Sequence, residues 1–302
     1  MAQKYHSISD ELKKEYGCKV YRLSLSAGCT CPNRDGKISY GGCSFCSEGG
    51  SGDFAAPFLP VNEQIAIAKE KIAAKLPKKS EERKVKYIAY FQSFTNTYGD
   101  TKRLEELFTE TIEREDIAIL SVATRPDCLE DDKLEMLKRL NEKKPVWIEL
   151  GLQTIHEKTA EGFNRGYRLK VFEESYKRLA AAGIKVIVHV ILGLPGESRE
   201  EMLETIKYLA ALQPVLFGIK LSLLHVLRGT RLAREYEKAP FKIMSLEEYC
   251  ELVADCLRIL PEETTVHRIT GDGPKKLLIE PKWSADKKRV LNELNRVIKE
   301  KL

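Results

Sequence analysis

The sequence predicts an α/β protein whose parallel β-sheet closes part of a barrel. Apolar, β-branched segments alternate with amphipathic helical segments through most of the 302 residues, and this alternation is typical of βαβ units around a parallel sheet. The apolar segments carry apolar residues on both faces, as strands buried from both sides do. Six units fit a partial (β/α)6 barrel of the TIM type, and chains of this length often form one such barrel.

Six strands are predicted between these helical segments. In chain order they cover residues 20–26, 85–91, 117–123, 146–152, 185–192 and 217–224. Two of the helices begin with a capping-box pattern, in which Ser198 is followed by Glu201 and Ser245 by Glu248. Because barrel enzymes place their chemistry at the C-terminal ends of the strands, we expect functional residues directly after each strand.

The chain is divided into a barrel domain, residues 1–265, and a short C-terminal extension, residues 266–302. The extension contains a basic amphipathic helix that we expect to pack on the barrel. The apolar stripe of this helix consists of Val290, Leu291, Leu294, Val297 and Ile298.

Positive charge is concentrated near the C-terminus. The chain carries a formal net charge of +5, and the segment from Lys275 to Leu302 holds nine Lys or Arg and four Asp or Glu. One interpretation is a solvated terminal helix, which is the usual meaning of a charge run. The other is a phosphate-binding edge, since a basic stripe is typical of a nucleic-acid partner. The candidate contacts are Lys275, Lys276, Lys287 and Lys288.

No targeting or membrane-spanning segment is recognisable. The N-terminus lacks a basic start followed by an apolar stretch, and the most apolar region, near 209–227, is interrupted by Gln213, Pro214, Lys220 and His225. We therefore expect a cytoplasmic protein that makes no contact with a membrane. Thiols stay reduced in that compartment, so disulfides are the least favoured use of the cysteines.

Four of the eight cysteines lie together after the first predicted strand: Cys29, Cys31, Cys43 and Cys46. The pattern Cys43-x2-Cys46 is a metal-binding spacing. A structural zinc site needs four ligands, whereas an iron–sulfur cluster that keeps one iron open needs three. The other cysteines, Cys18, Cys128, Cys250 and Cys256, are predicted to be structural.

The position of the loop favours the three-ligand cluster, held by Cys31, Cys43 and Cys46. The loop follows the first strand, where a barrel places its chemistry. Cys29 is two residues from Cys31 on an extended segment that leads into the loop, and we expect it to point away from the cluster. The glycines at 41, 42, 49, 50 and 52 are expected to let the backbone approach a bulky cofactor.

Eight motifs resemble those of the YhcC/YtqA-type radical S-adenosylmethionine (SAM) family, which is related to the Elongator catalytic subunit. In order they are CPNRDG with GGCSFC, ATRPDCL, ELGLQT, FNRGY, GLPGES, LHVLRGT and VHRITGDGP. The resemblance covers nearly the whole chain. It implies a radical SAM barrel in which Cys31, Cys43 and Cys46 hold a 4Fe–4S cluster that chelates SAM.

The same resemblance implies further SAM contacts. Gln92 and Ser93 stand where the family meets the methionine amino group, Gln153 and Arg165 where it reaches the ribose or the carboxylate, and Ile191 and Gly193 where a strand flanks the adenine. Phe45 is the aromatic residue before the last cluster cysteine. The alternative for each is a polar strand end or a tight turn.

Three positions depart from the family pattern. His189 stands where relatives have an acidic ribose ligand, Ala123 where they often have a carboxylate for SAM, and Tyr167 where a His is expected. Glu149 is a candidate to supply that carboxylate; alternatively, it is a strand residue buried against a base.

The resemblance implies an enzyme that uses a 5′-deoxyadenosyl radical to modify a tRNA wobble uridine, converting 5-carboxymethylaminomethyl-uridine to 5-aminomethyl-uridine. Flavodoxin or ferredoxin is the expected electron donor, and tRNA the expected partner. The catalytic residues are not identified. The alternatives are a radical SAM enzyme with a small-molecule or other RNA substrate and a non-catalytic, zinc-stabilised RNA-binding protein.

Overall fold

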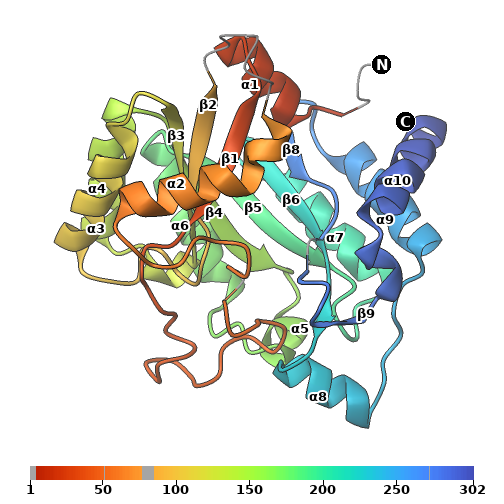
Figure 1. Ribbon diagram of the computed structural model, residues 1–302. Coiled ribbons are helices and arrows are strands. Elements are labelled where there is room, and N and C mark those ends of the chain that lie inside the picture. The colour runs from red at the N-terminus through yellow and green to blue at the C-terminus, as the bar shows by residue number, and fades with distance from the viewer. Residues whose placement is uncertain (1–4, 51, 77–84, 272) are drawn as a thin grey trace.

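A single parallel β-sheet of seven strands organises the molecule (Figure 1). In this computed structural model, residues 5–50, 52–76, 85–271 and 273–302 are described. The strand order is β1-β2-β3-β4-β5-β6-β8. The strands are β1 (Val20–Leu25), β2 (Lys86–Phe91), β3 (Ile117–Thr124), β4 (Val146–Gln153), β5 (Lys185–Leu192), β6 (Gly218–Leu223) and β8 (Thr265–Arg268). The sheet curls into a partial barrel, so the predicted fold class and all six predicted strands are confirmed.

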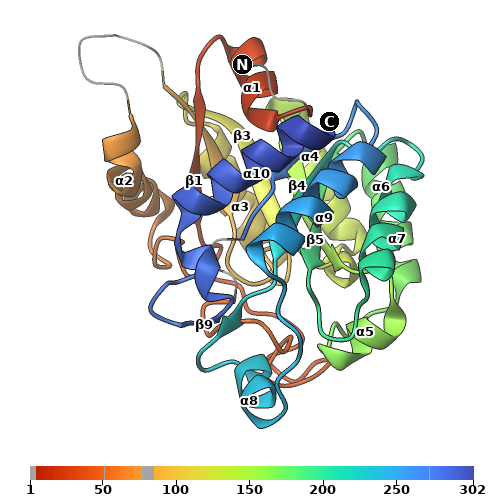
Figure 2. The ribbon, with the colours of Figure 1, turned by 90° about the vertical axis from the view of Figure 1, so that its right-hand side faces the viewer.

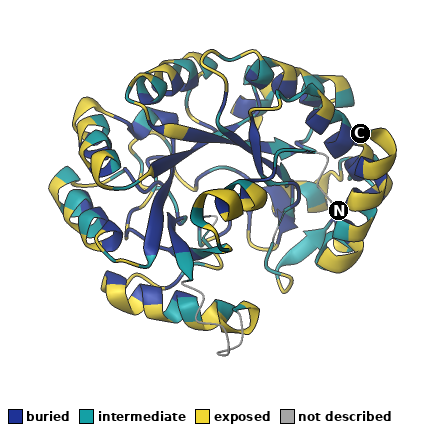
Figure 3. Ribbon diagram, turned by 90° about the horizontal axis from the view of Figure 1, so that it is seen from above, coloured by how far each residue is buried: buried dark blue, intermediate teal, exposed yellow. Residues whose placement is uncertain are grey.

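Helices surround the outer face of the sheet. They are α2 (Val61–Ile72), α3 (Thr101–Ile112), α4 (Asp131–Lys143), α6 (Leu169–Ala181), α7 (Arg199–Ala210) and α9 (Leu246–Ile259). Viewed from above, their inner faces are buried and their outer faces exposed (Figure 3). Both predicted capping boxes form, at the start of α7 and of α9, because each Ser and Glu satisfy backbone N–H groups that the first turn leaves unpaired.

Smaller elements complete the fold. The short helices are α5 (Glu157–Gly162), α8 (Arg231–Lys238), η1 (Ala73–Lys75), η2 (Pro126–Cys128) and η3 (Lys282–Ala285). A two-stranded ribbon pairs β7 (Val226–Leu227) with β9 (Leu278–Glu280). The terminal helix α10 (Lys287–Lys301) lies beside α9 (Figure 2). Its predicted apolar stripe is buried at Val290, Leu294, Val297 and Ile298 and partly buried at Leu291.

The seventh strand, β8, was not predicted. It lies across the proposed boundary between residues 265 and 266, and it pairs with β6 in the barrel sheet. The strand is only four residues long, and its burial falls off toward His267 and Arg268, so it lacks an apolar run that a pattern search would find. The division into a barrel and an extension remains a proposal.

Side chains inside the barrel form layers. At the N-terminal ends of the strands, helix α1 (Ile8–Tyr16) packs its Ile8 and Leu12 against an apolar layer of Ile88, Ile119, Trp147 and Ile187. The N-terminal segment also joins the sheet, because Ser7 bridges Val266 of β8 in parallel and the His6 carbonyl accepts from the Val266 N–H at 2.7 Å. This end of the barrel is therefore closed.

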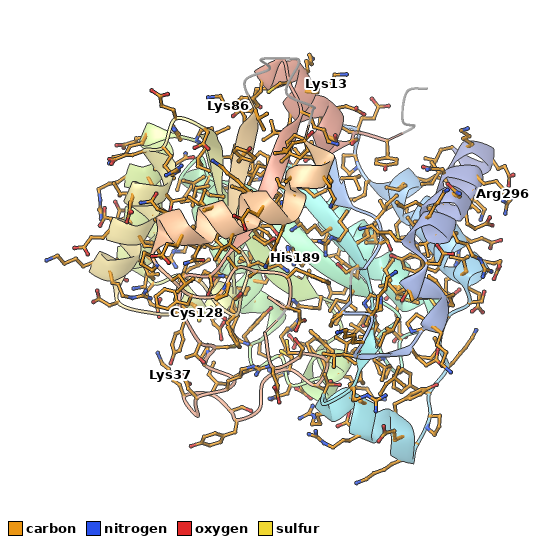
Figure 4. All side chains as sticks on the ribbon, in the orientation of Figure 1. Lys13, Lys37, Lys86, Cys128, His189 and Arg296 are labelled. Carbon is orange, nitrogen blue, oxygen red and sulfur yellow. The ribbon has the colours of Figure 1, made fainter. Side chains whose placement is uncertain are left out.

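Above the apolar layer lies a polar layer with one residue from each strand. Its members contact one another or lie side by side in the sheet register, and they are Arg22, Tyr90, Ser121, Glu149, His189, Lys220 and Arg268. Figure 4 shows His189 among the strands at the centre of the molecule. Beyond this polar layer, toward the C-terminal strand ends, the barrel opens into a pocket.

Candidate active site

The pocket lies at the C-terminal ends of the strands, where barrel enzymes place their chemistry. Its volume is about 270 Å³. The loop after β1, described at residues 26–50 and 52–60, forms one wall, and the segments after β4, β6 and β8 form others. These loops occupy the lower half of Figure 1. The same end of the molecule therefore holds most of the residues that the sequence predicted to be functional.

The three predicted cluster cysteines, Cys31, Cys43 and Cys46, all line this pocket. Their loop is held by its own backbone: the Arg34 N–H donates to the Cys31 carbonyl at 2.7 Å and the Cys46 N–H to the Cys43 carbonyl at 3.0 Å. Asn164, which follows α5, fastens the loop through its side-chain amide, which donates to the Gly42 carbonyl at 3.1 Å. The thiols thus converge from a loop that is anchored independently of any cofactor.

The three thiols influence one another. A hydrogen bond with Cys46 and burial raise the pKa of the Cys43 thiol well above its ordinary value, and nearby Cys31 adds to the effect. Such crowding disfavours three free thiolates, and binding to iron relieves it because thiolates are the ligands of iron–sulfur clusters. The donor set therefore fits a cluster.

A one-ion zinc site fits less well. The fourth thiol of the zinc alternative, Cys29, does not line the pocket, and its sulfur lies 3.4 Å from Arg103 Nη2 instead.

Most of the predicted SAM contacts also line the pocket: Phe45, Gln92, Glu149, Gln153, Arg165, His189 and Ile191. Ser93 and Gly193 do not. Ser93 is buried and packs against Gly52, whereas Gly193 has a positive φ of 90° at the turn after β5 and packs near Met244. The assignment of these residues to SAM stays a proposal.

Gln153 has a strained backbone. Its φ of 66° lies in the left-handed region, which costs a residue other than glycine about 1 kcal/mol or more. Phe94 and Asn164 are also left-handed, with φ values of 59° and 61°. Phe94 lines the pocket, and Asn164 holds its cysteine loop. Strain of this kind gathers at functional sites, where the surrounding structure holds it in place.

The guanidinium group of Arg165 donates hydrogen bonds to backbone carbonyls and to Glu157. The side chain is 1% exposed. It donates from Nη1 to the carbonyls of Leu152 (3.2 Å) and Thr154 (2.7 Å), from Nε to the Tyr167 carbonyl, and from Nη2 to Glu157 at 3.1 Å. These bonds fix the turn between β4 and α6, so we expect Arg165 to shape the pocket rather than to donate to a ligand.

Glu149 is buried against bases, as the second interpretation of this residue proposed. Its Oε2 contacts Lys220 Nζ and lies 2.7 Å from His189 Nε2, while its Oε1 accepts from the Ser121 hydroxyl at 2.9 Å. Although burial raises the pKa of Glu149, Lys220, Arg22 and His189 together hold it well below the ordinary value. Glu149 is thus an ionised carboxylate whose two oxygens already have protein partners.

Several residues at the pocket had no role predicted from the sequence. Arg125 pairs with Asp127 at 2.7 Å. Its positive charge also acts on the Cys43 thiol, where it opposes the rise in pKa. Tyr167 lies beneath the guanidinium groups of Arg125 and Arg165, and Arg268 comes from the unpredicted β8. Arg125 and Arg268 belong to two of the quoted motifs, ATRPDCL and VHRITGDGP, so the signal was in the sequence without a role attached to it.

Two of the loop glycines make room for protein rather than for a cofactor. A Cβ atom on Gly50 would collide with the ring of Phe94, and one on Gly52 would collide with the side chain of Ser93. The expectation that these glycines admit a bulky cofactor is therefore wrong for this pair. They let the cysteine loop pack closely against the end of β2.

The four candidate lysines Lys275, Lys276, Lys287 and Lys288 are exposed. Three of them, with Lys282 and Arg289, line a surface depression together with Trp283, Ala285 and Asp286. We call Lys275, Lys282, Lys287, Lys288 and Arg289 the basic depression. Arg296 lies on α10 away from it (Figure 4) and is paired with Glu293 and Glu300.

Known proteins are similar to this chain over nearly its full length. The protein YtqA of Bacillus subtilis is 43% identical over 97% of this chain and 89% of its own. YhcC of Escherichia coli is 33% identical over 96% of this chain and 91% of its own. The solved structure of Methanocaldococcus infernus Elp3 superposes with a TM-score of 0.67 at 17% identity, covering 94% of this chain and 64% of that one.

Family models match both parts of the chain. The model of the Radical SAM superfamily matches residues 30–209, which include the three cysteines predicted to hold the cluster, and the model of the Radical_SAM C-terminal domain matches residues 217–300. Among the described helices, none is long and apolar enough to cross a membrane. The chain belongs to the radical SAM superfamily, whose enzymes use a 4Fe–4S cluster and S-adenosylmethionine as cofactors.

Proposed function

We propose that this radical SAM enzyme acts on tRNA, converting the wobble nucleoside 5-carboxymethylaminomethyl-uridine to 5-aminomethyl-uridine. When bound, the cluster and SAM supply a 5′-deoxyadenosyl radical, which removes a hydrogen atom from a carbon that acids and bases do not activate. The protein binds and orients the side chain of the nucleoside and keeps water away from it.

The observation that carries the proposal is the position of the basic depression beside the pocket. Pro274 lines the pocket and the next residue, Lys275, lines the depression. The other cations of the depression come from η3 and α10. Phosphates bind such clusters with little regard to sequence, because each contact releases counterions from the nucleic acid. An RNA backbone held in the depression would therefore place a nearby nucleotide at the pocket.

Exposed aromatic side chains on the cysteine loop support an RNA substrate. Tyr40 is 80% exposed, Phe58 59% and Phe54 47%, and Phe54 also lines the pocket. Proteins that recognise unpaired RNA bases stack them on exposed aromatic rings. The anticodon loop of tRNA offers unpaired bases on both sides of the wobble position.

We propose the following cofactor contacts. Cys31, Cys43 and Cys46 hold the cluster, and Gln92 and Gln153 at the ends of β2 and β4 orient SAM together with Phe45 and Ile191. We expect Ser93, Gly193 and Arg165 to support this wall from behind, given their packing. Flavodoxin or ferredoxin is the proposed reductant of the cluster.

Nucleoside analysis tests the substrate directly. Total tRNA from a strain that lacks the gene is digested and its nucleosides are analysed by mass spectrometry. We expect 5-carboxymethylaminomethyl-uridine to accumulate and 5-aminomethyl-uridine and its derivatives to disappear. The wild-type gene should restore them, and the matched Cys43→Ala gene should not. An unchanged nucleoside profile would show that the substrate is a different RNA or a small molecule.

A further inference from the structure

The polar layer inside the barrel is unusual for its position. Apolar layers normally fill the interior of a barrel, and a buried ion pair adds little stability compared with apolar residues of the same size. Here one polar side chain from each strand points inward, directly below the pocket. Four of the seven, Tyr90, Glu149, His189 and Arg268, also line that pocket. The polar layer is therefore accessible to a ligand.

The polar layer contains more positive than negative charge. Arg22, Lys220 and Arg268 are its basic members, and Glu149 is its single carboxylate. Both oxygens of Glu149 have hydrogen-bond partners, which are Ser121, His189 and Lys220. Arg22 Nη2 also lies 3.7 Å from Oε1. Within the polar layer, the one carboxylate thus already has protein partners at both of its oxygens.

The pKa values of Lys220 and His189 reflect the positive charge of their neighbours in the polar layer. Burial and Arg22 lower the pKa of Lys220 well below its ordinary value, although Glu149 opposes them. Burial and Lys220 lower the pKa of His189 to about 4, so this imidazole is neutral near pH 7 and adds no charge. An anion entering the pocket would relieve the repulsion between the basic groups.

The geometry shows where an anion would bind. In the sheet register His189 lies beside Lys220, and Lys220 lies beside Arg268, so the three side chains form a row across β5, β6 and β8. Arg268 and His189, at the two ends of this row, line the pocket, whereas Lys220 between them does not, and its Nζ lies 4.3 Å from the centre of the Tyr90 ring. A guanidinium group binds a carboxylate through two parallel N–H···O bonds.

We propose that the polar layer, with Arg268 at its pocket face, binds the carboxylate of the substrate side chain. This inference rests on the proposed function, in which the substrate ends in a carboxymethyl group. The product of that reaction ends in a protonated amine, which the same basic groups repel. The polar layer would then select the substrate and favour release of the product.

The first test compares two RNA ligands with the unaltered holoenzyme. Anticodon stem-loop RNAs carry either 5-carboxymethylaminomethyl-uridine or its neutral carboxamide isostere, and the dissociation constants are measured without reductant so that no turnover occurs. We expect the carboxylate RNA to bind at least about tenfold more tightly, since hydrogen bonds to a charged group are the stronger ones. Equal affinities would overturn the proposal without any substitution in the protein.

The second test substitutes Arg268. Arg268→Gln should remove most of the preference for the carboxylate RNA and leave the affinity for the carboxamide RNA within about twofold, while Arg268→Lys should retain part of the preference. The matched control is Arg258→Gln, an exposed arginine on α9, which should behave as the wild type. Circular dichroism and the visible absorption of the cluster establish that each variant is folded and loaded.

The outcomes separate this inference from the proposed function. If the holoenzyme binds and converts the carboxylate RNA but Arg268→Gln keeps the full preference, the carboxylate site is wrong and the tRNA function stands. If neither RNA binds and neither is converted, the tRNA function fails, and the carboxylate site fails with it. A preference that is lost in Arg268→Gln and partly kept in Arg268→Lys supports both.

Discussion

Gln153 and Arg165 are polar neighbours of the same pocket, yet they use their side chains differently. Gln153 ends β4 in a left-handed conformation and faces the pocket, whereas the Arg165 guanidinium is taken up by three carbonyls and Glu157. We therefore expect the two residues to respond differently to the same substitution.

Gln153→Ala should weaken SAM binding about tenfold and leave the melting temperature and the cluster spectrum nearly unchanged. Arg165→Ala should instead lower the free energy of unfolding by at least about 3 kcal/mol, because several buried acceptors lose their donor. Calorimetric titration with SAM and thermal melts distinguish the two effects. A fully stable Arg165→Ala protein that no longer binds SAM would contradict our account of Arg165.

The cysteines give a second contrast between residues. Replacing Cys31, Cys43 or Cys46 by Ala should abolish cluster binding, whereas Cys29→Ala, whose thiol lies beside Arg103 outside the pocket, should retain the iron content and absorption of the wild type. Iron and sulfide analysis of anaerobically reconstituted protein measures this. Loss of the cluster in Cys29→Ala would mean that the cluster has four protein ligands.

His189 makes the stability of the fold depend on pH. An unfolded histidine binds a proton near pH 6.5, whereas burial and Lys220 lower the pKa of His189 to about 4. Between these values the folded state binds fewer protons, so the contribution of His189 is complete above about pH 6.5 and is lost as the pH falls toward 4.

The shift in the His189 pKa corresponds to about 3 kcal/mol. Denaturant unfolding of the wild type and of His189→Gln, at about pH 7.5 and pH 4.5, isolates this contribution. We expect the wild type to lose more stability than the variant on acidification. An equal loss in both would show that other groups carry the acid sensitivity.

At the scale of elements, α10 combines a structural face with a charged one. Val290, Leu294, Val297 and Ile298 are buried against the barrel, while Lys287, Lys288 and Arg289 at its start contribute to the basic depression. The periodicity of the sequence predicted both faces. The grouping of Lys275 and Lys282 beside them was also expected from the sequence, and in the structure it involves the ribbon that β9 forms with β7.

Neutralising Lys275, Lys276, Lys287 and Lys288 to Gln should weaken tRNA binding and flatten its dependence on salt, by up to about 0.9 log units for each phosphate that is no longer neutralised. Filter binding at two salt concentrations measures the effect. The control changes Lys13, Lys14, Lys102 and Lys170, which are exposed elsewhere; Lys13 lies at the opposite end of the barrel (Figure 4). Identical salt slopes for both sets would exclude the basic depression as the tRNA-binding surface.

For the molecule as a whole, the sequence predicted most strands of the sheet but not the arrangement of the side chains inside the site. All six predicted strands form, because each is rich in apolar residues on both faces. β8 was missed because its four residues end in His267 and Arg268. The hydrogen bonds that Arg165 makes within the protein were not predictable from the sequence, and neither was the polar layer. Both depend on which segments the fold places side by side.

The position of β8 in the sheet leads to a prediction about the whole chain. A protein that ends at residue 265 lacks most of β8 and all of α10, and it leaves β6 as an exposed strand edge. We expect it to be insoluble, whereas a protein that ends at residue 286 keeps β8 and should lose less. Soluble expression and circular dichroism compare them. Cooperative unfolding of the shorter protein would establish residues 266–302 as a dispensable extension.

The bridge between Ser7 and Val266 joins segments from nearly opposite ends of the chain. A ribosome makes the first of these segments long before the second, so during synthesis the N-terminal segment has to wait for its neighbour in the sheet. Contacts between such distant segments slow folding, because a long loop must close before they form. The enclosed end of the barrel is therefore completed only after β8 has emerged from the ribosome.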